Sequence, residues 1–211
     1  MTTTSSPDRC CSWRRAHGIA LVIAGLIAAP ASFPLHADTL TIDFEGLADS
    51  TPVTTQFSNV VFSNATAISA GISLNEFEFP PRSGTNVVFD DGGPMSILFT
   101  SLVFDFTGYF TYLMPITLEA FDVNSNFVAS LTSQFSSNLG LSGDPGSLPN
   151  ELFQLSYAPG IAQVTITGDP FGGSFTLDDV TVVTAIPEPS SGILFLTGAA
   201  SFLLAGRKRK R

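Results

Sequence analysis

Cysteine, histidine and tryptophan are almost absent from this chain of 211 residues. The two cysteines, two histidines and one tryptophan all lie within the first 36 positions: Cys10, Cys11, Trp13, His17 and His36. Any domain that begins after them has no thiol and no imidazole. That domain therefore cannot use disulfides, cysteine nucleophiles, Cys or His metal sites, or a Ser-His-Asp triad.

Positive charge is scarce in the same part of the chain. From residue 38 to residue 186, Arg82 is the only cation against sixteen Asp and Glu residues. The formal charge of this region is therefore −15, compared with −9 for the whole chain. Without a patch of Lys or Arg it cannot neutralise phosphates, which excludes nucleic-acid binding. Such an acidic surface suits a solvated exterior and divalent cations.

Residues 1–37 have the organisation of a secretory signal peptide. An arginine pair at 14–15 provides the positive n-region, and residues 16–31 are apolar apart from one histidine. Small residues follow, which predict cleavage by signal peptidase before Asp38. Residues 29–31, Ala-Pro-Ala, also match the cleavage pattern and would place the cut six residues earlier. The residues after the arginine pair do not continue a twin-arginine signal, so we expect export by the general secretory route.

The last 26 residues, 186–211, combine three features in order. The tripeptide 187–189, Pro-Glu-Pro, is stiff and extended, because each proline fixes its φ angle and disfavours helix at the preceding residue. Residues 190–206 carry no charge. As a helix they span about 25 Å, slightly less than the roughly 30 Å hydrocarbon core of a bilayer. The five basic residues 207–211 favour a transmembrane helix with a cytoplasmic tail over a buried core helix.

This tripartite order resembles the PEP-CTERM sorting signal of Gram-negative bacteria, over about an eighth of the chain. The resemblance implies transient anchoring in the inner membrane, processing by exosortase (an integral-membrane cysteine protease or transpeptidase), and transfer to the cell surface or exopolysaccharide matrix. By the same resemblance the recognition residues are Pro187, Glu188 and Pro189, and the stop-transfer residues are Arg207, Lys208, Arg209, Lys210 and Arg211. The alternative is a plain C-terminal membrane anchor on a periplasmic glycan-binding domain.

Residues 38–185, between these two segments, have the composition of one all-β domain. They contain sixteen Phe residues and many Thr, Val, Ser and Gly residues, and no long stretch shows a helical period. Short runs of β-forming residues alternate with turn residues, which is typical of an antiparallel β-sandwich. The pattern predicts strands at 40–44, 56–63, 87–89, 97–106, 116–123, 127–134, 152–156, 163–167 and 173–183.

Two of these segments allow finer predictions. Leu102, Phe104 and Phe106 alternate with polar or smaller residues, so we expect them to share one buried face of a strand. In the predicted strand 116–123, the alternation of apolar and polar residues changes phase near Phe121, which indicates a bulge. Residues 122–126 then form a polar turn with two asparagines that tolerate the left-handed conformation, and they predict a hairpin.

Acidic residues mark the first and last predicted strands. Asp43 and Glu45 lie two apart on the first, hence on one face, and Asp178 and Asp179 are adjacent on the last. An Asp-x-Glu first strand and a Leu-Asp-Asp-Val last strand resemble jelly-roll carbohydrate-binding-like domains. That resemblance implies that the end strands pair, and that these four acids with backbone carbonyls are candidate ligands of a structural calcium ion, which prefers oxygen. The alternative is that they are solvated carboxylates or strand-end caps.

Two tyrosines are the candidate contacts for a sugar. Sugar sites usually present Trp or Tyr to the apolar faces of sugar rings, and residues 38–186 contain no Trp. Tyr109 and Tyr112 lie close together after the expected end of a strand. They are a candidate platform, with a purely structural aromatic cluster as the alternative.

Carboxylates are the only acid-base pairs available to an enzyme. A glycosidase needs two of them across a cleft, roughly 5–9.5 Å apart. Asp43 with Glu45 and Asp90 with Asp91 are pairs in sequence, and nothing in the sequence places either pair in a cleft. The run from Asp90 to Gly93 instead predicts a hairpin turn, with a second cation loop as the alternative.

The sequence therefore predicts a non-enzymatic exported protein with a jelly-roll-like β-sandwich ectodomain. Its expected partners are signal peptidase, exosortase, the inner membrane during transit and exopolysaccharide. The candidate ligands of the ectodomain are calcium and glycan. The alternatives are the anchored periplasmic domain and a carboxylate-based glycosidase.

Overall fold

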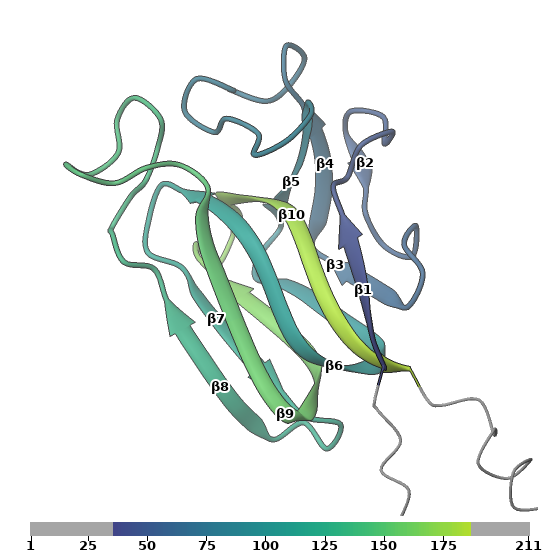
Figure 1. Cartoon of the computed structure of the whole chain (residues 1–211). Coiled ribbons are helices and arrows are strands. Elements are labelled where there is room, and N and C mark those ends of the chain that lie inside the picture. The colour runs from purple at the N-terminus through teal and green to yellow at the C-terminus, as the bar shows by residue number, and fades with distance from the viewer. Residues whose placement is uncertain (1–35, 187–211) are drawn as a thin grey trace, which may run out of the picture. The chain divides into compact units, whose positions relative to one another are not determined.

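The computed structural model describes residues 36–186, and these residues form ten β-strands with no helix among them (Figure 1). All pairs of strands are antiparallel, which confirms the predicted all-β class. The strands are β1 (His36–Ile42), β2 (Thr51–Pro52), β3 (Val60–Ser63), β4 (Ala65–Ser69), β5 (Asn86–Asp91), β6 (Met95–Tyr112), β7 (Thr117–Phe121), β8 (Phe127–Thr132), β9 (Glu151–Thr167) and β10 (Gly172–Ile186).

Hydrogen bonds join the strands continuously, and two long strands, β6 and β9, pass from one layer of the sandwich to the other (Figure 1). The first sheet has the order β2-β4-β5-β10-β6-β9, with β1 also paired to β10. The second sheet has the order β3-β6-β9-β7-β8. The start of β6 and the end of β9 belong to the second sheet. Strand β6 bends between the two sheets where its register against β9 shifts, between Leu98 and Val103.

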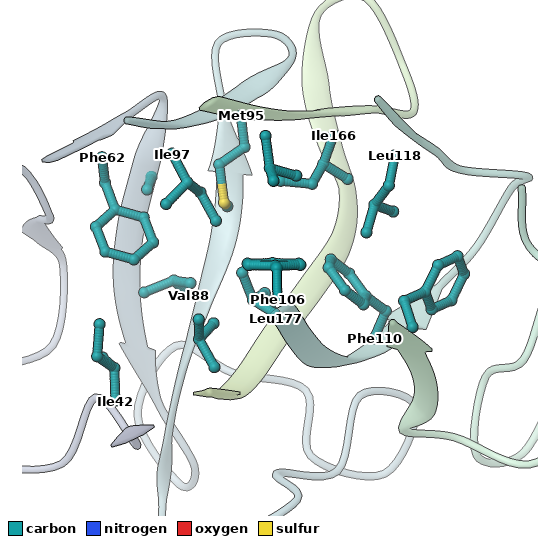
Figure 2. Packing of buried hydrophobic residues seen from close by; sticks show 14 of the residues in the cluster. Ile42, Phe62, Val88, Met95, Ile97, Phe106, Phe110, Leu118, Ile166 and Leu177 are labelled. Carbon is teal, nitrogen blue, oxygen red and sulfur yellow. The ribbon is translucent and has the colours of Figure 1, made fainter. Parts of the chain in front are cut away.

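The core lies between the two sheets. Figure 2 shows side chains of the two layers directed toward one another: Phe62, Met95, Ile97, Leu118 and Ile166 from the second sheet, and Ile42, Val88, Phe106, Phe110 and Leu177 from the first. All of these are at most 2% exposed. Each such large side chain contributes about 1.5–3 kcal/mol on burial. This core confirms the predicted antiparallel β-sandwich.

The predicted strands all have counterparts, but some limits are wrong. The segments 152–156 and 163–167 are parts of one strand, β9, which continues through Gly160 at a φ of 109°. Pro159 and Gly160 interrupt the β pattern in the sequence, which is why two strands were expected. Strands β2 and β4 were not predicted.

The expected alternation at 102–106 is wrong. Phe106 is buried, but Leu102 is 38% exposed and Phe104 is only partly buried, whereas Val103 is buried. The register of β6 against β9 shifts again between Val103 and Asp105. This irregularity changes the phase of the side chains, so a simple period of two cannot hold across the bend.

The predicted hairpin at 122–126 is confirmed, since β7 and β8 pair across it. The register between these strands shifts between Ala120 and Phe121, where the sequence indicated a bulge. The residue in the left-handed conformation is Ser125, with a φ of 61°, rather than either asparagine. Asp122 accepts hydrogen bonds from the backbone of both asparagines and thereby shapes the turn.

The hairpin predicted at 90–93 is wrong. Strand β5 pairs with β4 and β10, whereas β6 pairs with β3, β9 and β10, so the two strands on either side of this turn do not pair with each other. Residues 92–94 instead cross from the first sheet to the second. Two glycines with positive φ angles make the crossing possible.

The first and last strands pair, as the resemblance to jelly-roll domains implied. His36 lies opposite Ile186 and Ile42 opposite Val180, so both ends of the described chain leave the same end of the sandwich. The predicted signal-peptidase cut before Asp38 falls inside β1. The earlier cut after Ala31 would leave the whole strand intact.

The remaining predictions for the two ends concern segments outside the described residues. These are the apolar run of the signal peptide, the Pro-Glu-Pro motif, the helix at 190–206 and the basic tail. Within residues 36–186, no helix is long and apolar enough to cross a membrane.

Candidate ligand-binding groove

Residues 70–85 form a long loop that crosses the outer face of the first sheet. Near its start the loop lies beside Phe89 of β5 and Thr176 of β10. Near its end the guanidinium carbon of Arg82 lies 4.6 Å from the centre of the Tyr109 ring on β6. A cation at this distance from an aromatic face is a favourable contact. The loop therefore covers part of the sheet face and forms a wall for the rest.

Asp178 fastens this loop to the last strand. One carboxylate oxygen accepts hydrogen bonds from the backbone N–H groups of Arg82 (2.7 Å) and Ser83 (3.0 Å), and the other accepts from the N–H of Asp179 (2.7 Å). The side chain is 1% exposed. Burial raises the pKa of Asp178 to about 6, because the desolvated carboxylate is harder to ionise.

The other three predicted acids also accept hydrogen bonds, two of them from the backbone and one from a hydroxyl. Glu45 accepts from the N–H groups of Thr85 and Asn86, both at 2.8 Å, and so holds the end of the same loop. Asp179 accepts from the Ser83 hydroxyl at 2.8 Å and has a φ of 45°, at an irregularity in β10. Asp43 is more remote from the loop and accepts only from the N–H of Glu45, at 3.1 Å.

These contacts do not form the calcium site that the sequence suggested. In the described part of the chain, no three Asp, Glu, His or Cys side chains are grouped so that they could hold a metal ion. Glu45, Asp178 and Asp179 do converge on one loop, but their oxygens accept from N–H and O–H groups, which occupy the positions that a cation would need. The four residues thus do not fit calcium as one ligand set, and calcium binding stays a prediction.

An open groove lies between the loop and the outer face of β4 and β5. It has a volume of about 500 Å³, within the range of ligand sites. A second hollow of about 200 Å³ shares Ile68, Ser73 and Phe89 with it and reaches Thr176 on β10. The larger groove is lined by Ser50, Pro52, Thr66, Ile68, Ser73, Phe89 and Asp91.

The lining of the groove combines one partly exposed aromatic ring with polar groups. Phe89 provides an apolar surface between the two hollows. Asp91 is exposed at the rim and accepts a hydrogen bond of 2.8 Å from the hydroxyl of Thr66, which fixes the carboxylate in position. An apolar ring beside hydroxyl and carboxylate groups matches a ligand that has both apolar faces and hydroxyls.

Asp90 has a different role from its neighbour Asp91. Its side chain is fully buried and accepts from the backbone N–H groups of Ser174 (2.8 Å) and Phe175 (2.9 Å), and from the Ser174 hydroxyl (2.7 Å). Burial raises the pKa of Asp90. It joins the end of β5 to the start of β10, and burial keeps it from contacting a substrate together with Asp91.

The two predicted tyrosines do not form a platform. They are three residues apart on β6, so they point to opposite faces of the strand. Tyr112 is fully buried in the core, where its hydroxyl donates to Glu151 and burial raises its pKa. Tyr109 lies on the outer face, but Arg82 covers its ring. The expectation that both follow a strand end is wrong, because β6 continues to Tyr112.

The sequence did not identify Phe89 as a candidate ligand-binding residue. It is one of sixteen phenylalanines in the domain, most of which were expected in the core. Alternation in the predicted strand 87–89 places Phe89 on the face opposite Val88, but three residues do not show which of the two faces is the core. The loop that forms the groove around Phe89 comes from distant sequence, which no local pattern reveals.

Comparisons with known proteins give only distant structural likenesses. No family model matches the chain, and no curated protein matches it. One similar structure is an adhesin domain of Lys-gingipain from Porphyromonas gingivalis, with 11% identity, 69% of this chain and 97% of that chain covered, and a TM-score of 0.42. Another is a family 11 carbohydrate-binding module from Clostridium thermocellum, with 10% identity, 74% and 100% covered, and a TM-score of 0.33. At TM-scores below 0.5, these likenesses carry no argument about function.

Proposed function

We propose that this chain is a non-enzymatic exported protein of the cell surface or extracellular matrix, and that its sandwich binds glycan in the groove beside Phe89. The ligand assignment rests on the residues that line this groove. An aromatic ring can contact the apolar face of a sugar ring, while the exposed Asp91 carboxylate can accept hydrogen bonds from its hydroxyls; Thr66 and Ser73 already donate to Asp91 and Asp49. Exopolysaccharide is the glycan that a protein sorted to this location would meet.

The sorting assignment rests on the sequence after the last strand. Strand β10 ends at Ile186, and the next residue is Pro187. The motif that resembles an exosortase signal thus follows the folded domain directly. In this proposal signal peptidase removes the N-terminal segment, and the apolar run with its basic tail holds the protein in the inner membrane. Exosortase then acts near Glu188.

Substitution Phe89→Ala tests the groove. We expect it to weaken binding of exopolysaccharide fragments from the host about tenfold or more, because an aromatic contact contributes on the order of 1–3 kcal/mol. Isothermal titration of the soluble domain measures this. Leu148→Ala is the matched control, since Leu148 is 78% exposed on a loop that does not line the groove. Equal binding by the wild type and the Phe89 variant would show that the groove is not the site.

Substitution Glu188→Ala tests the sorting assignment. It should leave export intact and block release, so that the protein accumulates uncut in the inner membrane. Western blots of membrane and extracellular fractions measure this, with Glu119→Ala as a comparison within the folded domain. Equal processing of the Glu188 variant would favour the rival function, a plain membrane-anchored periplasmic domain.

The glycosidase alternative finds no support in the described residues. Asp90 is buried, and Asp43 and Glu45 both accept hydrogen bonds from the local backbone instead of facing each other across a cleft. A release of reducing sugar from exopolysaccharide by the purified domain would overturn the non-enzymatic assignment.

A further inference from the structure

The outer face of the second sheet is made of side chains in straight rows across all five strands. In the central row, Ser63 of β3 pairs with Ser96 of β6, which pairs with Thr165 of β9, then with Glu119 of β7 and Ser130 of β8. Neighbouring strands lie about 4.8 Å apart, so this row extends for about 19 Å. Ser63 and Ser130, at its two ends, are exposed, and the three residues between them are partly exposed.

Two further rows flank the central one at a distance of two residues, or about 7 Å, except that on β8 the register shift places Phe127 three residues from Ser130. One of them is mainly apolar and consists of Val61, Leu98, Gln163, Phe121 and Phe127. The other consists of Thr167, Thr117 and Thr132. The amide of Gln163 donates to the hydroxyls of Ser96 and Thr165, at 3.0 and 3.1 Å, which ties the apolar row to the central one.

This face differs from the rest of the domain in its charge. Glu119 is the only charged residue among the thirteen positions of the three rows, whereas residues 38–186 together have a formal charge of −15. The face is also open to solvent, since Leu98 is 46% and Phe127 57% exposed. Large apolar side chains in the open, framed by hydroxyls, are typical of an interaction surface.

We propose that this hydroxyl face, defined by the three rows, is a second polysaccharide-binding surface that takes a linear, uncharged glycan. The low charge selects a neutral partner, because an acidic polymer gains no cation here and is repelled by the rest of the domain. Hydroxyl and amide groups in register supply hydrogen bonds along the chain. The apolar row between Val61 and Phe127 supplies contact for sugar-ring faces.

The consequence is that one molecule can bridge two polysaccharide chains. The outer faces of the two sheets of a sandwich point in opposite directions, so the groove and the hydroxyl face cannot bind the same stretch of glycan. This bridging rests on the proposed function of the groove, whereas binding by the hydroxyl face does not. A protein with two such faces would cross-link the matrix that it enters.

Co-sedimentation with insoluble cellulose, xylan, mannan and cross-linked dextran tests the hydroxyl face. The wild-type domain should pellet with at least one of these neutral polymers. Thr165→Glu should reduce its apparent affinity about tenfold or more, because it places a carboxylate in the middle of the central row, where binding would have to desolvate it. Leu148→Glu is the matched control and should pellet like the wild type. If Thr165→Glu does not fold, as judged by thermal unfolding, Leu98→Ser replaces it, since Leu98 is exposed on the same face.

The pattern across variants separates the two surfaces. Weaker pelleting of both Thr165→Glu and Phe89→Ala supports both sites. Weaker pelleting of Thr165→Glu alone supports the hydroxyl face without the groove. Equal pelleting of Thr165→Glu and the wild type, or no pelleting with any of the four polymers, overturns the inference. A dimer in analytical ultracentrifugation that Thr165→Glu abolishes, without polysaccharide binding, would assign this face to a second copy of the chain instead.

Light scattering of soluble hydroxyethyl cellulose with added protein tests the bridging. The wild type should produce cross-linked particles, whereas Phe89→Ala and Thr165→Glu should each bind without cross-linking. Cross-linking by either single variant would contradict the two-face arrangement.

Discussion

The outer faces of the two sheets use acidic residues in different ways. On the first sheet, carboxylates hold a long loop down: Asp178 and Glu45 each accept two hydrogen bonds from its backbone or from the residue that follows it. On the second sheet, Glu119 is the single acid among the thirteen positions of the three rows. The comparison shows that three of the four acids predicted as calcium ligands, Glu45, Asp178 and Asp179, instead hold a loop against the first sheet.

The two faces should differ most in how far the free energy of unfolding falls when a carboxylate is removed. Asp178→Ala leaves three backbone N–H groups without their acceptor at a buried position, and we expect it to lower the free energy of unfolding by about 2–4 kcal/mol. Glu119→Ala should change it by no more than about 0.5 kcal/mol. Urea denaturation measures both. Similar losses for the two variants would contradict the contrast between the faces.

Asp178 should also make stability depend on pH. Its pKa is raised to about 6 in the folded protein, so the folded state binds the proton more tightly than the unfolded state. The contribution of Asp178 to stability should therefore be fully present below the unfolded pKa near 4 and be lost as the pH rises through about 6. Asp90, whose pKa is also raised by burial, contributes in the same direction.

The variant Asp178→Asn isolates this contribution. It should be less stable than the wild type at every pH, because the amide presents N–H groups to backbone donors, but its stability should fall less between pH 4 and 7. Melting temperatures over that range provide the measurement. An unchanged slope in the variant would show that Asp178 does not titrate there.

Calcium should have a smaller effect. Because the oxygens of Asp178 and Glu45 already accept N–H groups, we expect millimolar calcium or EDTA to shift the melting temperature by less than about 1 °C, below the roughly 2–4 °C that corresponds to 1 kcal/mol in a domain of this size. A rise of several degrees with calcium that is lost in Asp178→Asn would establish the site that the sequence suggested.

The smallest effect on folding should come from the hydroxyl face itself. Thr165→Ala removes a hydroxyl that receives one hydrogen bond from Gln163, and we expect a change in stability within about 0.5 kcal/mol. Thermal unfolding checks this. A large loss of stability would mean that these rows serve the fold rather than a ligand.

The sequence was sufficient for the fold class because the sandwich is built from local patterns. Runs of β-forming residues with turns between them correspond to β7, β8 and the hairpin at 122–126. The bend in β6 and the join within β9 were missed, because both depend on the pairing of distant segments rather than on local periodicity. Strand β4 was missed because its short run, Ala65 to Ser69, contains little apolar bulk.

The candidate sites were harder to predict. Pairing of β1 with β10 followed from the resemblance to jelly-roll domains, and it does bring Glu45, Asp178 and Asp179 to one loop. The partners of these carboxylates in the loop, however, are backbone amides and the Ser83 hydroxyl, which have no sequence signature. The rows of the hydroxyl face depend on the register between five strands, and Phe89 becomes a groove residue only when the loop lies beside it.

The sorting claim is tested most directly by the intact mass and the location of the mature protein in its native host, with and without exosortase. The account predicts a species that begins near Asp38, ends near Pro187 to Pro189, and lies outside the inner membrane only when exosortase is present. A species that still carries Arg207 to Arg211 in the inner membrane of both strains would contradict it. The chain would then be an anchored periplasmic domain.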